Sequence, residues 1–234
     1  MMQKVSHYAK SCSLELWSNY HALFTLLATI AATALHSFIP LILISILSFA
    51  YLVFNQSRAI TDAKPLNSPA NYVTAIRCLI VVYCFMNFQW ISVSWLFTLL
   101  LCNVFLDVLD GYIARKTGQT SEFGRVFDME VDAFFVNSMG LYFLFTTNVG
   151  YLMLLPGVLR YLYRLAVWSL PQPDYQETKK FYAAALAGIN FVLIVLAVIA
   201  PNPAQIYILF LSIILVSLSF TISFYEFFRH ASRH

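Results

Sequence analysis

Apolar residues gather along the chain in eight blocks, which short polar or proline-containing segments separate. The blocks occupy residues 21–36, 38–54, 71–88, 91–114, 123–146, 151–170, 181–200 and 205–228. Blocks of about twenty residues are long enough to cross a bilayer core of about 30 Å as helices. The pattern predicts an all-α integral membrane protein that crosses the bilayer several times, with about eight membrane helices.

The first two blocks are short, and His36 and Pro40 divide them. They predict an N-terminal helical hairpin, with a re-entrant hairpin or one long kinked span as alternatives. The first twenty residues are polar and mildly basic without a small-residue cleavage pattern, so we expect no cleaved signal peptide. The predicted organisation is a cytoplasmic N-terminal segment (1–20), a membrane hairpin (21–55), a polar linker (56–70), a six-helix membrane domain (71–228) and a cytoplasmic tail (229–234).

The composition agrees with a membrane protein. Of the 234 residues, 60% are hydrophobic and only 11% are charged, whereas about 25% of residues are charged in an ordinary soluble domain. The net charge of +3 comes from charges too sparse for a nucleic-acid-binding surface. We expect membrane lipids and small anions as partners, and no nucleic acid.

Basic residues predict how the chain is oriented. All but three of the 14 lysines and arginines lie on or near loops of one side, the exceptions being Arg77, Arg160 and Arg164. The opposite turns contain no Lys or Arg; they lie around Ser37, Gln89, Asn148 and Asn202. Because basic loops stay on the cytoplasmic side, we expect both termini there and a location in the cell inner membrane.

Acidic residues cluster where a membrane helix should have none. The block 91–114 ends with two acids and two small residues on one helical face: Asp107, Asp110, Gly111 and Ala114. The next block opens with a similar stripe at i, i+4, i+8: Gly124, Asp128 and Asp132. A short polar loop joins the two helices, so they must be antiparallel neighbours whose carboxylates converge beneath the cytoplasmic surface.

Four like charges in a low-dielectric site repel one another unless a cation holds them together. Oxygen ligands without His or Cys favour Mg²⁺ or Mn²⁺, and four carboxylates can bridge two ions. Two ions indicate phosphate chemistry. The alternative is that the acids are solvated helix ends paired with Arg115, Lys116 and Arg125, but Asp132 lies roughly 15 Å along its helix from the loop.

The residues from Asp107 to Asp132 read DxxDGxxAR, eight further residues, then GxxxDxxxD. This pattern resembles the CDP-alcohol phosphotransferase (CDP-alcohol phosphatidyltransferase) family, and every fixed position is filled. The six blocks of 71–228 resemble the six-helix catalytic core of that family. The resemblance implies that an acceptor alcohol attacks the β-phosphorus of a CDP-linked donor and releases CMP.

The resemblance also implies roles for the motif residues. Asp107, Asp110 and Asp128 would bind metal, and Asp132 would be the general base, also touching the second ion. The residues expected to accommodate CMP are Gly111, Ala114, Arg115 and Gly124.

Two further polar groups belong to the predicted site. Asn71, Thr74 and Arg77 resemble the NxxTxxR stretch of the family and are expected to bind nucleotide; alternatively, they begin an amphipathic helix from which Arg77 snorkels to headgroups. Arg160 and Arg164, at i, i+4, predict a pocket for an acidic acceptor or for phosphate. The alternative for these arginines is charge balance with Asp132 or Glu130, or snorkelling by Arg164.

Glu130 lies two positions from both Asp128 and Asp132 and therefore off their face. We expect it to pair with a neighbouring helix rather than with a metal ion. Ala133 stands where relatives that accept glycerol phosphate commonly carry Lys, so the acceptor does not follow from the resemblance.

The sequence favours an enzyme of phospholipid synthesis that transfers a phosphatidyl group from CDP-diacylglycerol to an alcohol. One alternative is a CDP-aminoalcohol phosphotransferase with diacylglycerol as acceptor. Another is an ion-coupled or divalent-cation transporter, but the charges cluster on one side rather than at the midplane, and no inverted repeat is apparent. Relatives of this kind often form homodimers, although nothing in the sequence locates an interface.

Overall fold

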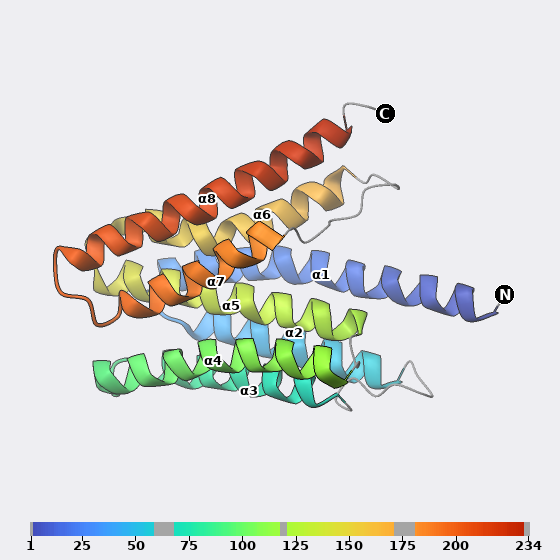
Figure 1. Cartoon of the computed structure of the whole chain (residues 1–234), viewed down its shortest axis with the longest axis horizontal. Coiled ribbons are helices and arrows are strands. Elements are labelled where there is room, and N and C mark those ends of the chain that lie inside the picture. The colour runs from blue at the N-terminus through green and yellow to red at the C-terminus, as the bar shows by residue number, and fades with distance from the viewer. Residues whose placement is uncertain (1, 59–67, 118–120, 171–180, 232–234) are drawn as a thin grey trace.

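The computed structural model describes the backbone of residues 2–58, 68–117, 121–170 and 181–231, and the side chains of 14–55, 68–117, 121–170 and 185–229. Within these ranges the chain forms helices and no strand, which confirms the all-α prediction (Figure 1). The elements are α1 (Met2–Ala34), α2 (Ile39–Arg58), α3 (Pro69–Met86), α4 (Val93–Thr117), α5 (Glu122–Thr146), the 3₁₀ helix η2 (Gly150–Leu154), α6 (Leu155–Ser169), α7 (Phe181–Leu196) and α8 (Ala204–Ala231).

Three helices of the described chain are long and apolar enough to cross a membrane, namely α3, α4 and α8. Shorter apolar helical stretches lie at Ile39–Asn55 and Ala185–Leu196. Large hydrophobic side chains are exposed along the bundle, including Leu79, Phe105 and Ile214. An apolar exterior of this kind suits contact with lipid.

The N-terminal region is a helical hairpin. Helix α1 already begins at Met2, so the polar start of the chain is helical and continues into the first apolar block. The chain reverses at residues 35–38, where His36 has a left-handed φ of 49°, and α2 then packs against α1. The alternative of one long kinked span is therefore wrong.

Local sequence signals explain where the helices of the site begin. Pro69 occupies the first turn of α3, where its missing N–H costs no hydrogen bond. At the start of α5, the Ser121 hydroxyl accepts a hydrogen bond from the Gly124 amide at 3.0 Å, and Glu122 places a negative charge in the first turn.

Helix α5 is the centre of the bundle, and fifteen of its 25 residues are buried. Helix α3, which itself packs on α4, contacts α5, and so do α1 and α6. The approach of α6 is unusually close: a Cβ added at Gly157 would lie 2.5 Å from the Cα of Asn137. Asn137 also donates to the Thr29 hydroxyl of α1 at 2.7 Å. Helices α1 and α6 therefore both meet α5 at Asn137.

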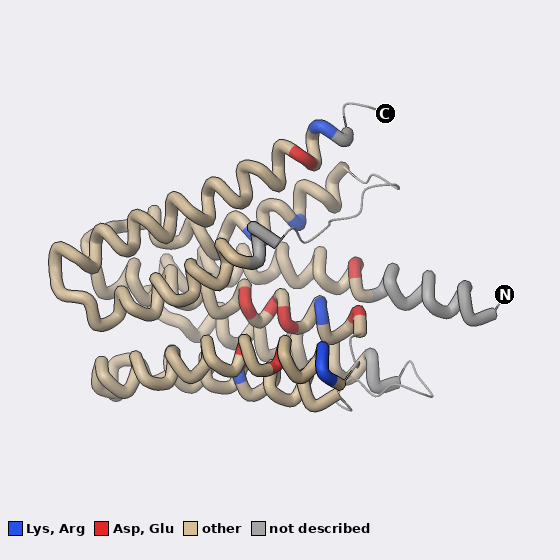
Figure 2. The backbone as a smooth tube through the Cα atoms, in the orientation of Figure 1, with Lys and Arg blue, Asp and Glu red and all other residues tan. Residues whose placement is uncertain are grey.

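Charged residues of the described chain lie in the half of the bundle toward which both termini point (Figure 2). The opposite end, with the turns between α1 and α2, α3 and α4, and α7 and α8, carries none of them. Among the described residues, charged side chains are therefore confined to one half of the bundle.

Candidate active site

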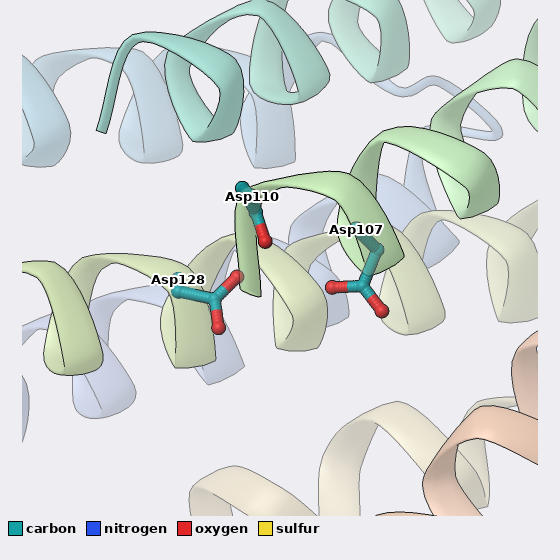
Figure 3. A group of neighbouring side chains, drawn as sticks. All are labelled: Asp107, Asp110 and Asp128. Carbon is teal, nitrogen blue, oxygen red and sulfur yellow. The ribbon is translucent and has the colours of Figure 1, made fainter. Parts of the chain in front are cut away.

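Four aspartates from two helices meet at the charged end of the bundle. Asp107 and Asp110 lie in the C-terminal half of α4, and Asp128 and Asp132 lie in the N-terminal half of α5. Carboxylate oxygens of Asp107, Asp110 and Asp128 lie within 4.8 Å of one another, and these side chains point toward one another from the two helices (Figure 3). The structure thus brings together the acids that the motif spacing placed on facing helices.

Arg77 of α3 connects all four carboxylates. Its Nη1 atom donates to Asp110 Oδ2 at 2.8 Å and to Asp128 Oδ1 at 2.7 Å. Its Nη2 atom lies 2.8 Å from an oxygen of Asp107 and 2.5 Å from one of Asp132. The Arg77 side chain is fully buried, so the snorkelling alternative is wrong. Arg77, rather than the surface cations Arg115, Lys116 and Arg125, pairs with these acids.

Neighbouring polar groups fix this arrangement. The Thr74 hydroxyl lies 3.1 Å from Asp110 Oδ2, to which it donates. The Asn103 amide of α4 donates to the backbone carbonyl of Arg77 at 2.9 Å. These contacts tie α3 to α4 at the level of the acids, and they hold the guanidinium where all four carboxylates reach it.

The acidic cluster has more negative than positive charge. Four carboxylates against one guanidinium leave a formal charge of −3. Asp110 is nearly buried, with 5% of its side chain exposed, whereas Asp107, Asp128 and Asp132 are 26%, 31% and 26% exposed. A buried guanidinium on one side and three accessible carboxylates on the other create a site that attracts cations.

The residues present fit a hard divalent cation. Asp107, Asp110 and Asp128 each offer one oxygen within 4.8 Å of the others, whereas ligands of octahedral Mg²⁺ lie about 2.9–4.2 Å apart, so small side-chain movements would bring these oxygens to a common ion. Carboxylate oxygens are the ligands that Mg²⁺ and Mn²⁺ prefer. Asp132 lies outside this group of three and meets the site through Arg77.

A cavity of about 530 Å³ opens beside the acids. This volume lies within the range of about 300–1,000 Å³ found for small-molecule sites. All but one of the predicted nucleotide-binding residues line it, together with two of the acids: Asn71, Thr74, Asp110, Gly111, Ala114, Arg115, Gly124 and Asp128. The exception is Arg77, which lies among the carboxylates instead.

Small residues make room for polar side chains in this cavity. A Cβ at Gly124 would lie 2.7 Å from the Asn71 side-chain oxygen, too close for both to stay in place. A Cβ at Gly111 would lie 3.3 Å from the end of the Arg115 side chain, which can move. The absence of a side chain at Gly124 of α5 therefore allows the Asn71 side chain of α3 to line the cavity.

A second cavity, of about 220 Å³, shares no lining residue with the first. Asp132 and Arg160 line it together with residues of α7 and α8. The predicted arginine pair does not stay together: Arg164 is not among the lining residues, and its Nη2 atom donates to the Glu15 carbonyl at 3.1 Å. Arg160 pairs with Glu130 at 3.3 Å, which is the charge balance named as its alternative.

Glu130 belongs to a polar junction that sequence reasoning did not foresee in full. The prediction that it pairs with a neighbouring helix is confirmed, since Arg160 of α6 contacts it. The missed partners come from α1: the Ser18 hydroxyl donates to Glu130 at 2.8 Å, and the His21 ring lies 4.0 Å from its other oxygen. Only the position of Glu130 off the aspartate face signalled this junction.

These features define a class of protein, a helical membrane protein with a cluster of acidic residues that line two cavities. The sequence model of the CDP-alcohol phosphatidyltransferase family matches residues 67–223, about two-thirds of the chain. The chain belongs to this family. No curated protein and no solved structure matches it significantly.

Family membership has direct consequences. It supports a membrane-embedded transferase that takes a CDP-alcohol as substrate and an alcohol as acceptor. The family uses divalent metal ions, and the three aspartates of this chain are able to bind one. The N-terminal hairpin lies outside the matched residues.

Proposed function

We propose that this protein transfers a phosphatidyl group from CDP-diacylglycerol to an acceptor alcohol, with release of CMP, in phospholipid synthesis. One observation carries the proposal: the motif acids line two separate cavities, Asp110 and Asp128 the larger and Asp132 the smaller, and these cavities differ in size and lining. A two-substrate transfer needs such an arrangement, since both substrates must meet at one phosphorus atom.

The larger cavity suits the CDP portion of the donor. Asn71 and Thr74 on one wall and Arg115 on another surround space next to Asp110 and Asp128. Arg115 would neutralise phosphate charge, because guanidinium groups form strong hydrogen bonds to phosphate oxygens. The glycines and Ala114 would let the nucleotide lie close to α4 and α5.

Asp107, Asp110 and Asp128 would hold the divalent metal, with Asp132 touching the second of two Mg²⁺ or Mn²⁺ ions. When bound, the ions supply positive charge that offsets the donor diphosphate and the developing charge on the leaving CMP. Arg77 has a different task in this proposal: it keeps the four carboxylates together and offsets part of their repulsion.

Asp132 would be the general base. It lines the smaller cavity, where an acceptor hydroxyl would lie with its oxygen toward the donor. As that oxygen forms a bond to the β-phosphorus, the bond between this phosphorus and the CMP oxygen breaks, and the hydroxyl proton passes to Asp132. Arg160, on the same cavity wall, would orient the acceptor.

The proposal includes a location. Lys and Arg lie at the end of the bundle that carries the acids and both termini. Because basic segments remain on the cytoplasmic side, the active site would face the cytoplasm in the cell inner membrane. Residues 71–228 would be the catalytic domain, with 1–20 and 229–234 in the cytoplasm, 21–55 as a membrane hairpin and 56–70 as the linker.

The decisive experiment measures CMP release. Purified protein in lipid vesicles would receive CDP-diacylglycerol, Mg²⁺ or Mn²⁺ and one of a panel of alcohols. We expect CMP and a new phospholipid in equal amounts with one alcohol, and neither product after chelation by EDTA. CMP release only from a CDP-aminoalcohol with diacylglycerol would instead establish the reverse arrangement. Absence of CMP from every combination would contradict the proposal.

A further inference from the structure

The N-terminal hairpin reaches the proposed acceptor site through Glu130. This side chain is buried between three helices, with 1% of the residue exposed. Its Oε1 atom accepts hydrogen bonds from Ser18 of α1 at 2.8 Å and from Arg160 of α6 at 3.3 Å. Its Oε2 atom lies 4.0 Å from the His21 ring. Glu130 is thus held from both sides, and its environment leaves no access for a substrate.

The hairpin side of this junction is itself held in place. The other ring nitrogen of His21, Nδ1, lies 2.8 Å from the Ser48 hydroxyl of α2, and the ring stacks on Trp17 with centroids 5.0 Å apart. Both helices of the hairpin therefore contribute to the position of His21. Such a buried network fixes its members more firmly than any single hydrogen bond.

Arg160 connects the junction to the cavity. It contacts Glu130 at one end and lines the 220 Å³ cavity that also contains Asp132. Among the residues that the structure describes around this cavity, Arg160 is the one cation, and the polar side chains of α7 and α8 there are uncharged: Asn190, Ser219 and Ser223. The charge that Arg160 presents to a substrate thus depends on Glu130.

A phosphorylated acceptor carries close to two negative charges and needs cations that are not already balanced. Here the carboxylate of Glu130 balances the guanidinium, and Asp132 adds a negative charge to the same cavity. Amides and hydroxyls suit the hydroxyl or amino groups of an acceptor without phosphate. An anionic acceptor would therefore find no uncompensated cation among the described side chains that line this cavity.

We propose that Glu130, which accepts a hydrogen bond from Ser18 and lies beside the His21 ring, is a positioning residue that balances the charge of Arg160 and so makes the acceptor cavity select an alcohol without phosphate. The inference rests on the proposed function, because it takes the smaller cavity as the acceptor site. It gives the N-terminal hairpin, which lies outside the family match, a part in acceptor choice.

The test compares each alcohol with its phosphorylated form, for example inositol with inositol phosphate and glycerol with glycerol 3-phosphate. CMP release from CDP-diacylglycerol gives kcat/KM for both. We expect the wild type to prefer the form without phosphate. In Glu130→Gln the ratio should shift toward the phosphorylated form by about tenfold or more, the effect of one hydrogen bond to a charged group, while the donor KM stays constant. Glu130→Asp keeps the charge and should keep the wild-type preference.

Two further variants serve if Glu130→Gln fails to fold. Replacing both partners, as Glu130→Gln with Arg160→Gln, removes the buried pair without leaving an unpaired charge; this protein should still discriminate against phosphorylated acceptors. Ser18→Ala removes one hydrogen bond and no charge, and should shift the ratio in the same direction as Glu130→Gln by a smaller factor.

Three results would overturn the inference alone: a wild type that prefers phosphorylated acceptors, an unchanged ratio in both Glu130→Gln and Ser18→Ala, or a donor KM that changes as much as the acceptor KM. Absence of CMP from the wild type with every acceptor would overturn the proposed function, and the inference with it.

Discussion

The two faces of helix α5 carry two polar clusters that differ in charge and in exposure. On one face, Asp128 and Asp132 join the acids of α4 around Arg77, with a formal charge of −3 and three partly exposed carboxylates. On the other face, Glu130 is balanced by Arg160 and enclosed by α1. The two clusters are two residues apart in sequence.

The difference separates a site that binds ligands from one that positions a neighbour. Uncompensated negative charge inside a membrane protein is unfavourable in free energy unless bound cations neutralise it. A balanced and enclosed pair has no such need, and its contribution lies in fixing geometry. Substitutions on the aspartate face should therefore change chemistry and metal binding, whereas substitutions at Glu130 should change acceptor choice.

The largest effect is expected from Asp132→Asn. The amide cannot accept the acceptor proton, and loss of a general base costs about 10²–10⁴-fold in rate. CMP release should fall accordingly, while equilibrium binding of CMP to the variant stays near the wild-type level. The matched control is Glu15→Gln on α1, whose exposed carboxylate lies outside both clusters. Undiminished CMP release from Asp132→Asn would remove this residue from the mechanism.

Arg77→Met should have the next largest effect, on stability. The change keeps an unbranched side chain but leaves four carboxylates without their common counter-ion. Removing one partner of a buried ion pair costs about 3–5 kcal/mol. We expect a lower thermal unfolding temperature in EDTA, partly restored by Mn²⁺, because metal charge replaces the guanidinium. Equal stability of variant and wild type in EDTA would show that Arg77 does not hold the acids together.

Metal binding itself should stabilise the wild type by about 2.7 kcal/mol when the free ion is at 100 times its dissociation constant. Asp110→Asn, which removes the most buried of the candidate ligands, should lose most of this gain. Glu130→Gln should keep it, since Glu130 faces away from the acids. Thermal unfolding with increasing Mn²⁺ measures both. If Asp110→Asn and Glu130→Gln lost the same amount of Mn²⁺-dependent stabilisation, the two faces of α5 would not differ in metal binding.

The sequence predicted those parts of the site that depend on spacing along a helix. The acids of α4 and α5 and their small neighbours recur at helical intervals, and the short loop between these helices made them face each other. The turn at residues 35–38 was indicated by His36 and Pro40. Because these signals are local in sequence, they can be interpreted without knowledge of the rest of the fold.

The contacts of the site that the sequence did not predict depend on how each helix is rotated against helices distant in sequence. Arg77 reaches Asp132, 55 positions away, and Ser18 reaches Glu130, 112 positions away. Arg160 and Arg164 share a helical face, yet only Arg160 is among the residues lining the cavity, while Arg164 meets the backbone of α1. The apolar pattern predicts a helix only from residue 21 onward, because the residues that begin α1 are polar.

The smallest predicted effect tests the donor side of the aspartate face. In Gly124→Ala the new Cβ would lie 2.7 Å from the Asn71 side-chain oxygen, so Asn71 must leave its place in the cavity wall. Losing one neutral hydrogen bond costs about 0.5–1.5 kcal/mol, so the KM for CDP-diacylglycerol should rise by about twofold to tenfold with an unchanged acceptor KM. In Gly111→Ala the new Cβ would meet only the movable end of the Arg115 side chain, at 3.3 Å, so the KM for CDP-diacylglycerol should rise less. If the acceptor KM rose instead, the larger cavity would not be the donor site, and the assignment of one substrate to each cavity would have to be reversed.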